Sequence, residues 1–370
     1  MRILITGSSG FIGSNLKVRL AELSHIEYVT YAHSDGVNEL ENVAADVDAV
    51  IHLAGVNRPK DPAEYIPGNL DFTEQLCDVL EKRGKLSHVL FASSSQALLD
   101  NPYGKSKRDA EEVLENFARK TGSVVSLFRL PNVFGKWCRP EYNSVVATFC
   151  HHIANDLAIE IHDPDAVLKL VYVDDVITAL LETLAAPQDN SGLVTVSPEY
   201  TITVGLLAEM LQEYRDSRDS LLISEVGIGL KRALYATYLS YLQPGQFSYA
   251  LEEKSDDRGR FVEVLKTPGN GQFSFFTAKP GATRGGHYHH TKSEKFLVVQ
   301  GEALFRFRHL MSNQCHEIIT SATDPVVVET IPGWAHDITN AGNTELVVIL
   351  WANEIFDKNN PDTVKASVDD

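Results

Sequence analysis

The chain of 370 residues begins with Met1-Arg-Ile-Leu-Ile-Thr-Gly7-Ser-Ser-Gly10-Phe-Ile-Gly13. An apolar run followed by the spacing G-x-x-G-x-x-G predicts a buried strand, a tight turn and the start of a helix. Gly7 permits the turn, Gly10 lets backbone amides approach a pyrophosphate, and Gly13 allows close packing of helix on strand. Because the start of a helix stabilises phosphate groups, this stretch predicts nucleotide binding.

Short apolar runs alternate with amphipathic segments up to about residue 185. Residues 2–6, 50–54, 88–92 and 124–128 are typical of buried strands, and residues 72–82 and 106–120 have helical spacing of apolar residues. This alternation predicts an α/β fold with a Rossmann-type, doubly wound parallel sheet. Residues 195–243 are mainly helical in pattern and are expected to complete this unit as a substrate-binding lobe.

The end of the second predicted strand bears on the cofactor. A carboxylate there would bind the ribose 2′-hydroxyl of NAD, whereas His33 and Ser34 suit a 2′-phosphate. This favours NADPH as the cofactor. Asp35 lies just beyond these residues and could supply such a carboxylate, so NAD remains an alternative.

The stretch Asn101-Pro-Tyr103-Gly-Lys-Ser-Lys107 places a tyrosine and a lysine on one face of a helix. An ammonium beside a phenol favours the phenolate and lowers the pKa of the phenol. A pair of this kind suits proton transfer to or from a carbonyl oxygen. A serine run ends the strand just before it, and both Ser94 and Ser95 fit as the source of a hydroxyl.

Residues 7 to about 176 resemble the extended short-chain dehydrogenase/reductase family in the order of their motifs, which include Asp48-Ala-Val-Ile-His-Leu-Ala-Gly55, Arg129-Leu-Pro-Asn-Val-Phe-Gly135 and Tyr172-Val-Asp-Asp-Val176. The resemblance implies that Tyr103 is the general acid, that Lys107 tunes its pKa and binds the nicotinamide ribose, and that Ser94 orients the carbonyl. The cofactor-binding residues expected here are Gly7, Gly10, Phe11, Ile12, Gly13, His33, Ser34, Leu53, Ala54, Gly55, Tyr103, Lys107 and Pro131. Asn132 is implied as a ligand of a nucleotide-sugar, and the candidate phosphate or uridine contacts are Lys136, Arg139 and Asn143.

The pattern changes near residue 245 to short β-rich runs broken by turns. This spacing predicts a small antiparallel barrel or double-sheet roll. We therefore expect two domains, residues 1–245 and residues 246–370. The tail after residue 359 is polar and is expected to be loosely held.

The second predicted domain contains Gly281-Ala-Thr-Arg-Gly-Gly-His287-Tyr-His289-His-Thr-Lys-Ser-Glu294, which with Gly301 reads G-x5-H-x-H-x4-E-x6-G. Two imidazoles and a carboxylate that converge from adjacent strands suit zinc or another borderline divalent ion. His336, in a later P-G…H-x3-N stretch, is expected to be the fourth ligand. Together these motifs resemble the metal-binding cupin family, which implies a small all-β cupin barrel.

A D-x-R-G motif that begins at Asp256, followed by R-G-G-H ending at His287, resembles the sugar 3,5-epimerase cupins. In those enzymes a histidine abstracts a proton α to a ketone, and a lysine or arginine stabilises the enolate. The resemblance makes His287 and Lys295 catalytic candidates. A metal-bound imidazole cannot also be the base, so His287 is either a ligand or a base, and the other candidates for proton transfer are Lys295, Tyr288 and His290.

Over its full length the chain resembles the bifunctional capsular-polysaccharide enzymes that join such a reductase to a cupin. The stretches that carry this match include Phe134-Gly-Lys-Trp-Cys138 and Trp351-Ala-Asn-Glu-Ile-Phe-Asp357. The match implies zinc, a homodimer assembled through the cupin domain, and a UDP-linked 4-keto-6-deoxy amino sugar as substrate. C3 epimerisation and NADPH-dependent C4 reduction would give UDP-2-acetamido-2,6-dideoxy-L-talose, on the route to UDP-N-acetyl-L-fucosamine and capsule or O-antigen.

The overall composition excludes some classes of partner. A net charge of -17 argues against nucleic acid or an anionic membrane as the main partner. The four cysteines lie far apart without a C-x-x-C pair, which favours a reducing, cytoplasmic setting. We find no signal-peptide pattern before the first strand, and no apolar run approaches the roughly 20 residues that span a bilayer.

Two other functions remain as alternatives at this point. One is an NAD(P)-dependent nucleotide-sugar 4-epimerase or dehydratase with a structural cupin, although a dehydratase needs an acid–base pair where this chain has Gln96-Ala-Leu-Leu. The other is a redox sensor that keeps an NADP pocket without chemistry. The intact serine, tyrosine and lysine argue against a sensor.

Overall fold

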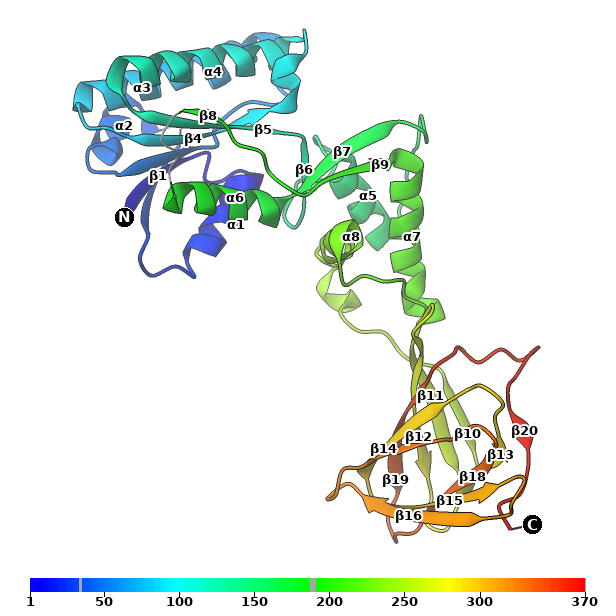
Figure 1. The fold of residues 1–370 in the computed structure, drawn as a ribbon. Coiled ribbons are helices and arrows are strands. Elements are labelled where there is room, and N and C mark those ends of the chain that lie inside the picture. The colour runs from blue at the N-terminus through cyan, green and yellow to red at the C-terminus, as the bar shows by residue number, and fades with distance from the viewer. Residues whose placement is uncertain (33–34, 187–190, 370) are drawn as a thin grey trace. The chain divides into compact units, whose positions relative to one another are not determined.

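A computed structural model of the chain describes residues 1–32, 35–186 and 191–369, which fold into two compact units (Figure 1). Unit 1 comprises residues 1–212 and 229–242, and unit 2 comprises residues 213–228 and the described residues from 243 onward. The segment 213–228 lies with unit 2, although the sequence analysis assigned it to the first region.

Unit 1 is built on a six-stranded sheet with the strand order β2-β1-β3-β4-β5-β8. Each neighbouring pair in this sheet is parallel. The strands are β1 (Arg2–Thr6), β2 (Glu27–Tyr31), β3 (Ala49–His52), β4 (His88–Ser94), β5 (Val124–Leu130) and β8 (Gly192–Leu193).

Helices cover both faces of this sheet, as Figure 1 shows. The residues of each strand point alternately to opposite faces. Leu4 and Val50 therefore pack on α2 (Val37–Ala44), α3 (Phe72–Arg83) and α4 (Pro102–Thr121), while Ile3 and Ile5 pack on α1 (Phe11–Leu20) and α6 (Val173–Ala185). The predicted doubly wound α/β fold is confirmed.

A second, smaller sheet in unit 1 has the order β6-β7-β9 and carries part of the region that follows β5. Its strands are β6 (Asn132–Phe134), β7 (Val167–Tyr172) and β9 (Glu199–Thr203). The helices of this part of the chain are α5 (Val145–Ala154), α7 (Val204–Ser220) and α8 (Gly229–Leu239). Short helices elsewhere in the chain are η2 (Pro62–Glu64), the π-helix η3 (Ile66–Asp71), η4 (Ser95–Leu98) and η5 (Pro244–Gln246).

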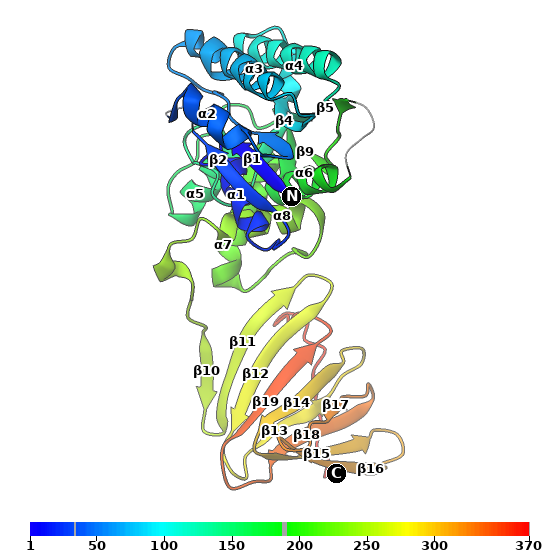
Figure 2. The same ribbon diagram turned by 90° about the vertical axis from the view of Figure 1, so that its left-hand side faces the viewer.

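Unit 2 contains two antiparallel sheets, with the orders β10-β11-β12-β19-β14-β17 and β16-β15-β18-β13-β20 (Figure 2). The strands are β10 (Glu253–Asp256), β11 (Gly259–Thr267), β12 (Gly271–Ala278), β13 (Thr283–Tyr288), β14 (Glu294–Gln300), β15 (Glu302–His309), β16 (Cys315–Ser321), β17 (Val327–Glu329), β18 (Trp334–Asn340), β19 (Leu346–Ala352) and β20 (Val364–Lys365). One core joins the two sheets, with Phe276 and Phe296 from the first and Phe305 and Ile338 from the second. The predicted all-β second domain is confirmed.

The tail after residue 359 differs from our expectation of a loosely held segment. Strand β20 pairs with β13, and the side chain of Val368 is buried. Polar residues are ordered here because the edge of β13 offers unpaired backbone groups and Asp362 accepts hydrogen bonds from backbone amides.

Two further expectations concern membranes and cysteines. None of the helices in the described part of the chain has the length and apolar character that crossing a bilayer requires. All four cysteines are free thiols.

Candidate functional sites

The glycine-rich turn between β1 and α1 is shaped by close backbone approaches. Gly7 has a φ of +69°, and a Cβ at this position would lie 2.6 Å from the amide nitrogen of Ala54. A Cβ on Gly13 would lie 2.3 Å from the carbonyl oxygen of Gly7. Strand, turn and helix therefore pack as closely as they do only because these side chains are absent.

The start of α1 is open to an anion. Gly10 is the N-cap, so no side chain caps the helix, and the first turn, which includes Phe11 and Ile12, has no acidic residue. Free amides and the positive end of the helix dipole favour a phosphate here. The prediction that His33 and Ser34 bind the cofactor falls outside the described residues.

The end of β3 lies against the same edge of the sheet. The amide of Leu53 donates to the carbonyl oxygen of Thr6 at 3.2 Å, and the amide of Ala54 donates to its hydroxyl at 3.3 Å. A Cβ on Gly55 would lie 2.8 Å from Oδ1 of Asn69 and 3.5 Å from Nζ of Lys107. The ammonium group of Lys107 therefore faces the edge where the predicted cofactor-binding residues meet.

Lys107 is buried on α4. Its Nζ donates to the carbonyl oxygen of Ala92 at 2.8 Å and lies 4.3 Å from the centre of the Phe91 ring. Burial lowers the pKa of Lys107 to about 8, against the opposing effect of Glu111. The lysine is thus held by strand β4, in a place where its charge is poorly solvated.

Tyr103 lies one turn before Lys107, near the start of α4. The side chain of Asn101 accepts the amide of Gly104 at 2.8 Å and caps this helix. A Cβ on Gly104 would lie 2.1 Å from the carbonyl oxygen of Gln96, so α4 begins in close contact with η4. This contact places Tyr103 beside the carboxyl end of β4.

Burial raises the pKa of Tyr103, a hydrogen bond with Ser94 acts in the opposite direction, and Tyr65 raises it further. This direction differs from the lowering that we expected from Lys107, because burial penalises the phenolate. Ser94 is buried and faces Tyr103, whereas Ser95 is exposed. The geometry therefore selects Ser94 from the serine run.

The ring of Tyr65 lies 5.6 Å from that of Tyr103, and the sequence analysis missed it because no motif marks it.

The predicted substrate-binding residues lie in and after β6, where Pro131, which is half-buried, leads from β5 to Asn132. Asn132 is exposed and its Nδ2 donates to the carbonyl oxygen of Lys169 at 3.0 Å. Lys136 forms an ion pair with Asp174, with an Nζ–Oδ1 distance of 2.6 Å, so its charge is already partnered. Arg139 lies over the ring of Tyr142, and Asn143 is exposed.

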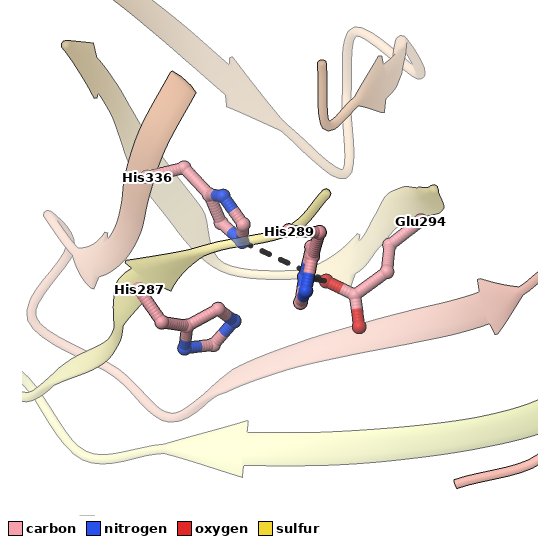
Figure 3. A group of neighbouring side chains, drawn as sticks. All are labelled: His287, His289, Glu294 and His336. Atoms are coloured by element: carbon pink, nitrogen blue, oxygen red, sulfur yellow. Dashed lines mark hydrogen bonds and ion pairs between the residues drawn. The ribbon is translucent and has the colours of Figure 1, made fainter. Parts of the chain in front are cut away.

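In unit 2 the four predicted metal ligands form one cluster (Figure 3). His287 and His289 come from β13 and the turn after it, Glu294 from the start of β14, and His336 from β18. One donor atom from each lies within 4.8 Å of the others. Two ligands on metal bonds of about 2.0–2.2 Å lie at most about 4 Å apart, so a bound ion would draw these atoms slightly closer together.

The hydrogen bonds of the cluster fit a cation. Nδ1 of His289 donates to the carbonyl oxygen of Asp362, and Nε2 of the same ring points into the cluster, 3.2 Å from Oε2 of Glu294. Both ring nitrogens of His336 are buried without a hydrogen-bond partner, and its Nε2 is 3.6 Å from Glu294 Oε2, beyond hydrogen-bond length. The residues present therefore fit a divalent metal ion.

The pKa shifts of His287 and Glu294 also fit a bound metal ion. Burial lowers the pKa of His287 to about 4 and so favours the neutral imidazole that binds metals. Burial alone would raise the pKa of Glu294, but His289, His336 and the charge of Lys292 outweigh it and lower that pKa. The carboxylate is therefore the favoured form.

Lys295, which we expected to be catalytic, lies away from the cluster. Its side chain is exposed and pairs with Glu329. Successive residues of a strand point to opposite faces, so Lys295 points outward when Glu294 points inward. Tyr288 and His290 likewise alternate with His287 and His289 and pack on each other, with ring centres 5.3 Å apart.

Lys292 is the cation that the sequence analysis missed. Its side chain is buried, and Nζ lies 3.3 Å from Oε1 of Glu294. It comes from the turn between β13 and β14, where no regular spacing indicates which way a side chain points. Asp362 was missed for a similar reason, since it is distant from the cluster in sequence.

Comparisons with known proteins agree with this division of the chain. Residues 3–196 match the NAD dependent epimerase/dehydratase family, and residues 254–364 match the polysaccharide biosynthesis C-terminal domain. The UDP-2-acetamido-2,6-beta-L-arabino-hexul-4-ose reductase of Pseudomonas aeruginosa is 51% identical over 368 residues, which cover 100% of this chain and 99% of that protein.

Two solved structures are similar over their whole length. The capsular polysaccharide assembling protein CapF from Staphylococcus aureus has a TM-score of 0.93 at 41% identity, with 100% of each chain covered. A structure of CapF with the inhibitor 3-isopropenyl-tropolone has a TM-score of 0.88 at 37% identity, also with 100% of each chain covered. The chain therefore belongs to the NAD dependent epimerase/dehydratase family, as a member that also carries a polysaccharide biosynthesis C-terminal domain, and it is similar to CapF over its whole length.

Proposed function

We propose that the chain is a bifunctional nucleotide-sugar enzyme, in which unit 2 epimerises C3 and unit 1 reduces C4 of a UDP-2-acetamido-2,6-dideoxy-4-keto-hexose with NADPH. The observation that carries the proposal is the pairing of a buried Ser94, a half-buried Tyr103 and a buried Lys107 at the nucleotide edge with a cluster of four candidate metal ligands in the second unit. Similarity over the whole chain to the Pseudomonas aeruginosa hexul-4-ose reductase supports the same substrate class.

In the reductase half, NADPH supplies the hydride that reaches C4. The raised pKa of Tyr103 keeps its phenol protonated, so the phenol can donate its proton to the C4 oxygen. Ser94 orients the carbonyl by a hydrogen bond, and Lys107 lies where it can bind the nicotinamide ribose beside Gly55. Asn132 and Asn143 are exposed at the predicted nucleotide-sugar side.

In the epimerase half, His287, His289, Glu294 and His336 would hold a zinc ion, which supplies Lewis-acid stabilisation of charge on a carbonyl oxygen when bound. We place His287 among the ligands, because its ring lies 4.7 Å from that of His336 and 4.9 Å from that of His289. The C3 proton passes to water and leaves an enolate, and a proton that water returns to the opposite face of C3 inverts it. The charge of Lys292, rather than that of Lys295, lies where it can stabilise the enolate oxygen.

The product of the two steps would be UDP-2-acetamido-2,6-dideoxy-L-talose, a precursor of UDP-N-acetyl-L-fucosamine for capsule or O-antigen. Reduction draws the epimerisation forward, because enolisation alone is close to equilibrium. We further propose a cytoplasmic homodimer that forms through unit 2.

The test is an incubation with the UDP-linked 4-keto sugar in D2O without NADPH, followed by NMR at C3. We expect deuterium to enter at C3, and NADPH to be consumed once it is added. His287→Ala should abolish the exchange, whereas His316→Ala, on the exposed surface of β16, should preserve it. NADPH consumption without exchange in the wild-type protein would leave a simple ketoreductase with a structural second unit.

A further inference from the structure

The last described residues of the chain form a strap along the metal-binding sheet. We define the strap as residues 362–369. Its strand β20 pairs with β13, with Lys365 opposite His287 and Val364 opposite Tyr288. The amide of Ala366 also donates to the carbonyl oxygen of Gly286 at 3.0 Å. The strand that carries His287 is therefore completed by a segment about 80 residues later in the sequence.

At the start of the strap, the carboxylate of Asp362 binds the turn between β13 and β14. Oδ1 accepts the amide of His290 at 2.8 Å, and Oδ2 accepts the amides of Thr291 and Lys292, each at 2.7 Å. Oδ2 also accepts the hydroxyl of Thr291 at 3.0 Å. One side chain thus gathers three successive amides of the short turn that separates two metal ligands, His289 and Glu294.

The backbone of the same residue orients one of these ligands. The carbonyl oxygen of Asp362 accepts Nδ1–H of His289 and so fixes the orientation of the ring. Nε2 then points toward Glu294, at 3.2 Å from Oε2. Residues that fix the ring of a metal-binding histidine in this way affect metal affinity by about 10–100-fold.

Other contacts hold the strap in place without Asp362. Arg308 donates to the carbonyl oxygen of Ser367 at 2.7 and 3.0 Å, and Arg306 pairs with Asp369 at 2.6 Å. The side chain of Val368 is buried. Loss of the Asp362 carboxylate should therefore free the turn without detaching the strap.

We propose that Asp362 is a positioning residue of the metal site in unit 2, which holds the turn 290–292 and orients His289 so that its Nε2 faces the ion. The proposal rests on the metal site of the proposed function. It assigns to the strap a part in metal binding that the four ligands alone do not provide.

The experiment uses the full chain after removal of bound metal by chelation. Affinity for Zn²⁺ is measured by competition with a chromophoric chelator, and the visible absorption of bound Co²⁺ reports the coordination geometry. Asp362→Ala keeps the backbone carbonyl that contacts His289 but frees the turn between His289 and Glu294, so it should weaken Zn²⁺ binding about 10–100-fold and change the Co²⁺ spectrum. Asp362→Asn, which keeps one acceptor oxygen, should restore part of both. Asp369→Ala removes a carboxylate from the same strap, which contacts Arg306 rather than the turn, and should bind like the wild type.

Wild-type affinity and spectrum in Asp362→Ala would overturn the proposal, and so would an equal loss in Asp369→Ala. If Asp362→Ala does not fold, the comparison of Asp362→Asn with Asp369→Ala decides in the same way. A wild-type protein that binds neither Zn²⁺ nor Co²⁺ would instead overturn the metal site itself. The proposed reductase activity of unit 1 would be unaffected by either result and is measured separately by NADPH consumption.

Discussion

The nucleotide site of unit 1 and the metal site of unit 2 are assembled from the chain in different ways. In unit 1 the functional groups follow β1, β3 and β4, which are neighbours in one parallel sheet. In unit 2 the donors come from β13 and β18 in one sheet and from β14 in the other. A parallel sheet brings the carboxyl ends of its strands to one edge, whereas a site between antiparallel strands depends on their register and on the face to which each residue points.

Two buried histidines illustrate the difference. His52 in unit 1 has a threonine on each ring nitrogen, with Nδ1 2.6 Å from Oγ1 of Thr6 and Nε2 3.0 Å from Oγ1 of Thr73. His336 in unit 2 has no hydrogen-bond partner on either nitrogen. A satisfied histidine serves packing, and an unsatisfied one among other donors is a candidate ligand.

The largest expected effect is a loss of reductase activity that leaves the C3 exchange activity of the second unit unchanged. Tyr103→Phe keeps the half-buried ring but removes the proton donor, so kcat for NADPH-dependent reduction should fall about 10²–10⁴-fold. Deuterium exchange at C3 should be unchanged, because Tyr103 belongs to unit 1 and the metal cluster to unit 2. NADPH oxidation and NMR exchange measure the two activities. Tyr28→Phe, on strand β2, is the control, and a loss of exchange in Tyr103→Phe would contradict independent sites.

Lys292 and Lys295 form a matched pair, because the first is buried beside the metal cluster and the second is exposed on the outer face of β14. Lys292→Ala removes the buried charge beside Glu294 and should slow C3 exchange about 10²–10³-fold, as loss of an enolate-stabilising group does. Lys295→Ala removes only an exposed charge that pairs with Glu329, so exchange should be unchanged. The NMR assay of C3 compares both variants, and the reverse result would return the catalytic role to Lys295.

The close packing of the glycine turn predicts a loss of stability in unit 1. Gly13→Ala would place its Cβ 2.3 Å from the carbonyl oxygen of Gly7, and overpacking of this kind costs about 1–3 kcal/mol. Gly192→Ala is the control, since nothing lies within 4 Å of a Cβ there. Denaturant unfolding and NADPH titration give the free energy of unfolding and the affinity. Equal stability of the two variants would show that the turn adjusts without cost.

The last prediction concerns the dependence of stability on pH. Burial lowers the pKa of His52 to about 3 from its usual 6.5, with a further contribution from Lys107. Between these values the unfolded chain binds a proton that the folded chain does not, so stability falls as pH falls below 6.5, by at most about 1.4 kcal/mol per pH unit from this residue. His52→Gln should have a shallower dependence of unfolding free energy on pH. Parallel curves for the variant and the wild type would contradict the buried, neutral state of His52.

Much of the first site was predictable because its residues lie close together in sequence and act at strand ends. The glycine turn, Tyr103 and Lys107 each follow a recognisable strand within a short stretch, and Ser94 was one of two candidates. The direction of the Tyr103 pKa was wrong, because the sequence showed the neighbouring lysine but not the burial of the phenol. Lys136 was expected to contact substrate, but an ion pair with Asp174 already engages its charge.

The amino-acid sequence by itself determined the order of the two folds, the glycine turn and the identity of the four clustered side chains, because strand period, glycine spacing and histidine spacing are local properties. Only the tertiary structure decided that Lys292 points inward while Lys295 points outward, and that Asp362 holds the turn between the ligands. Such facts depend on strand register and on contacts between residues far apart in sequence. The orientations of these side chains follow from how the whole unit packs, and a short stretch of sequence does not specify that packing.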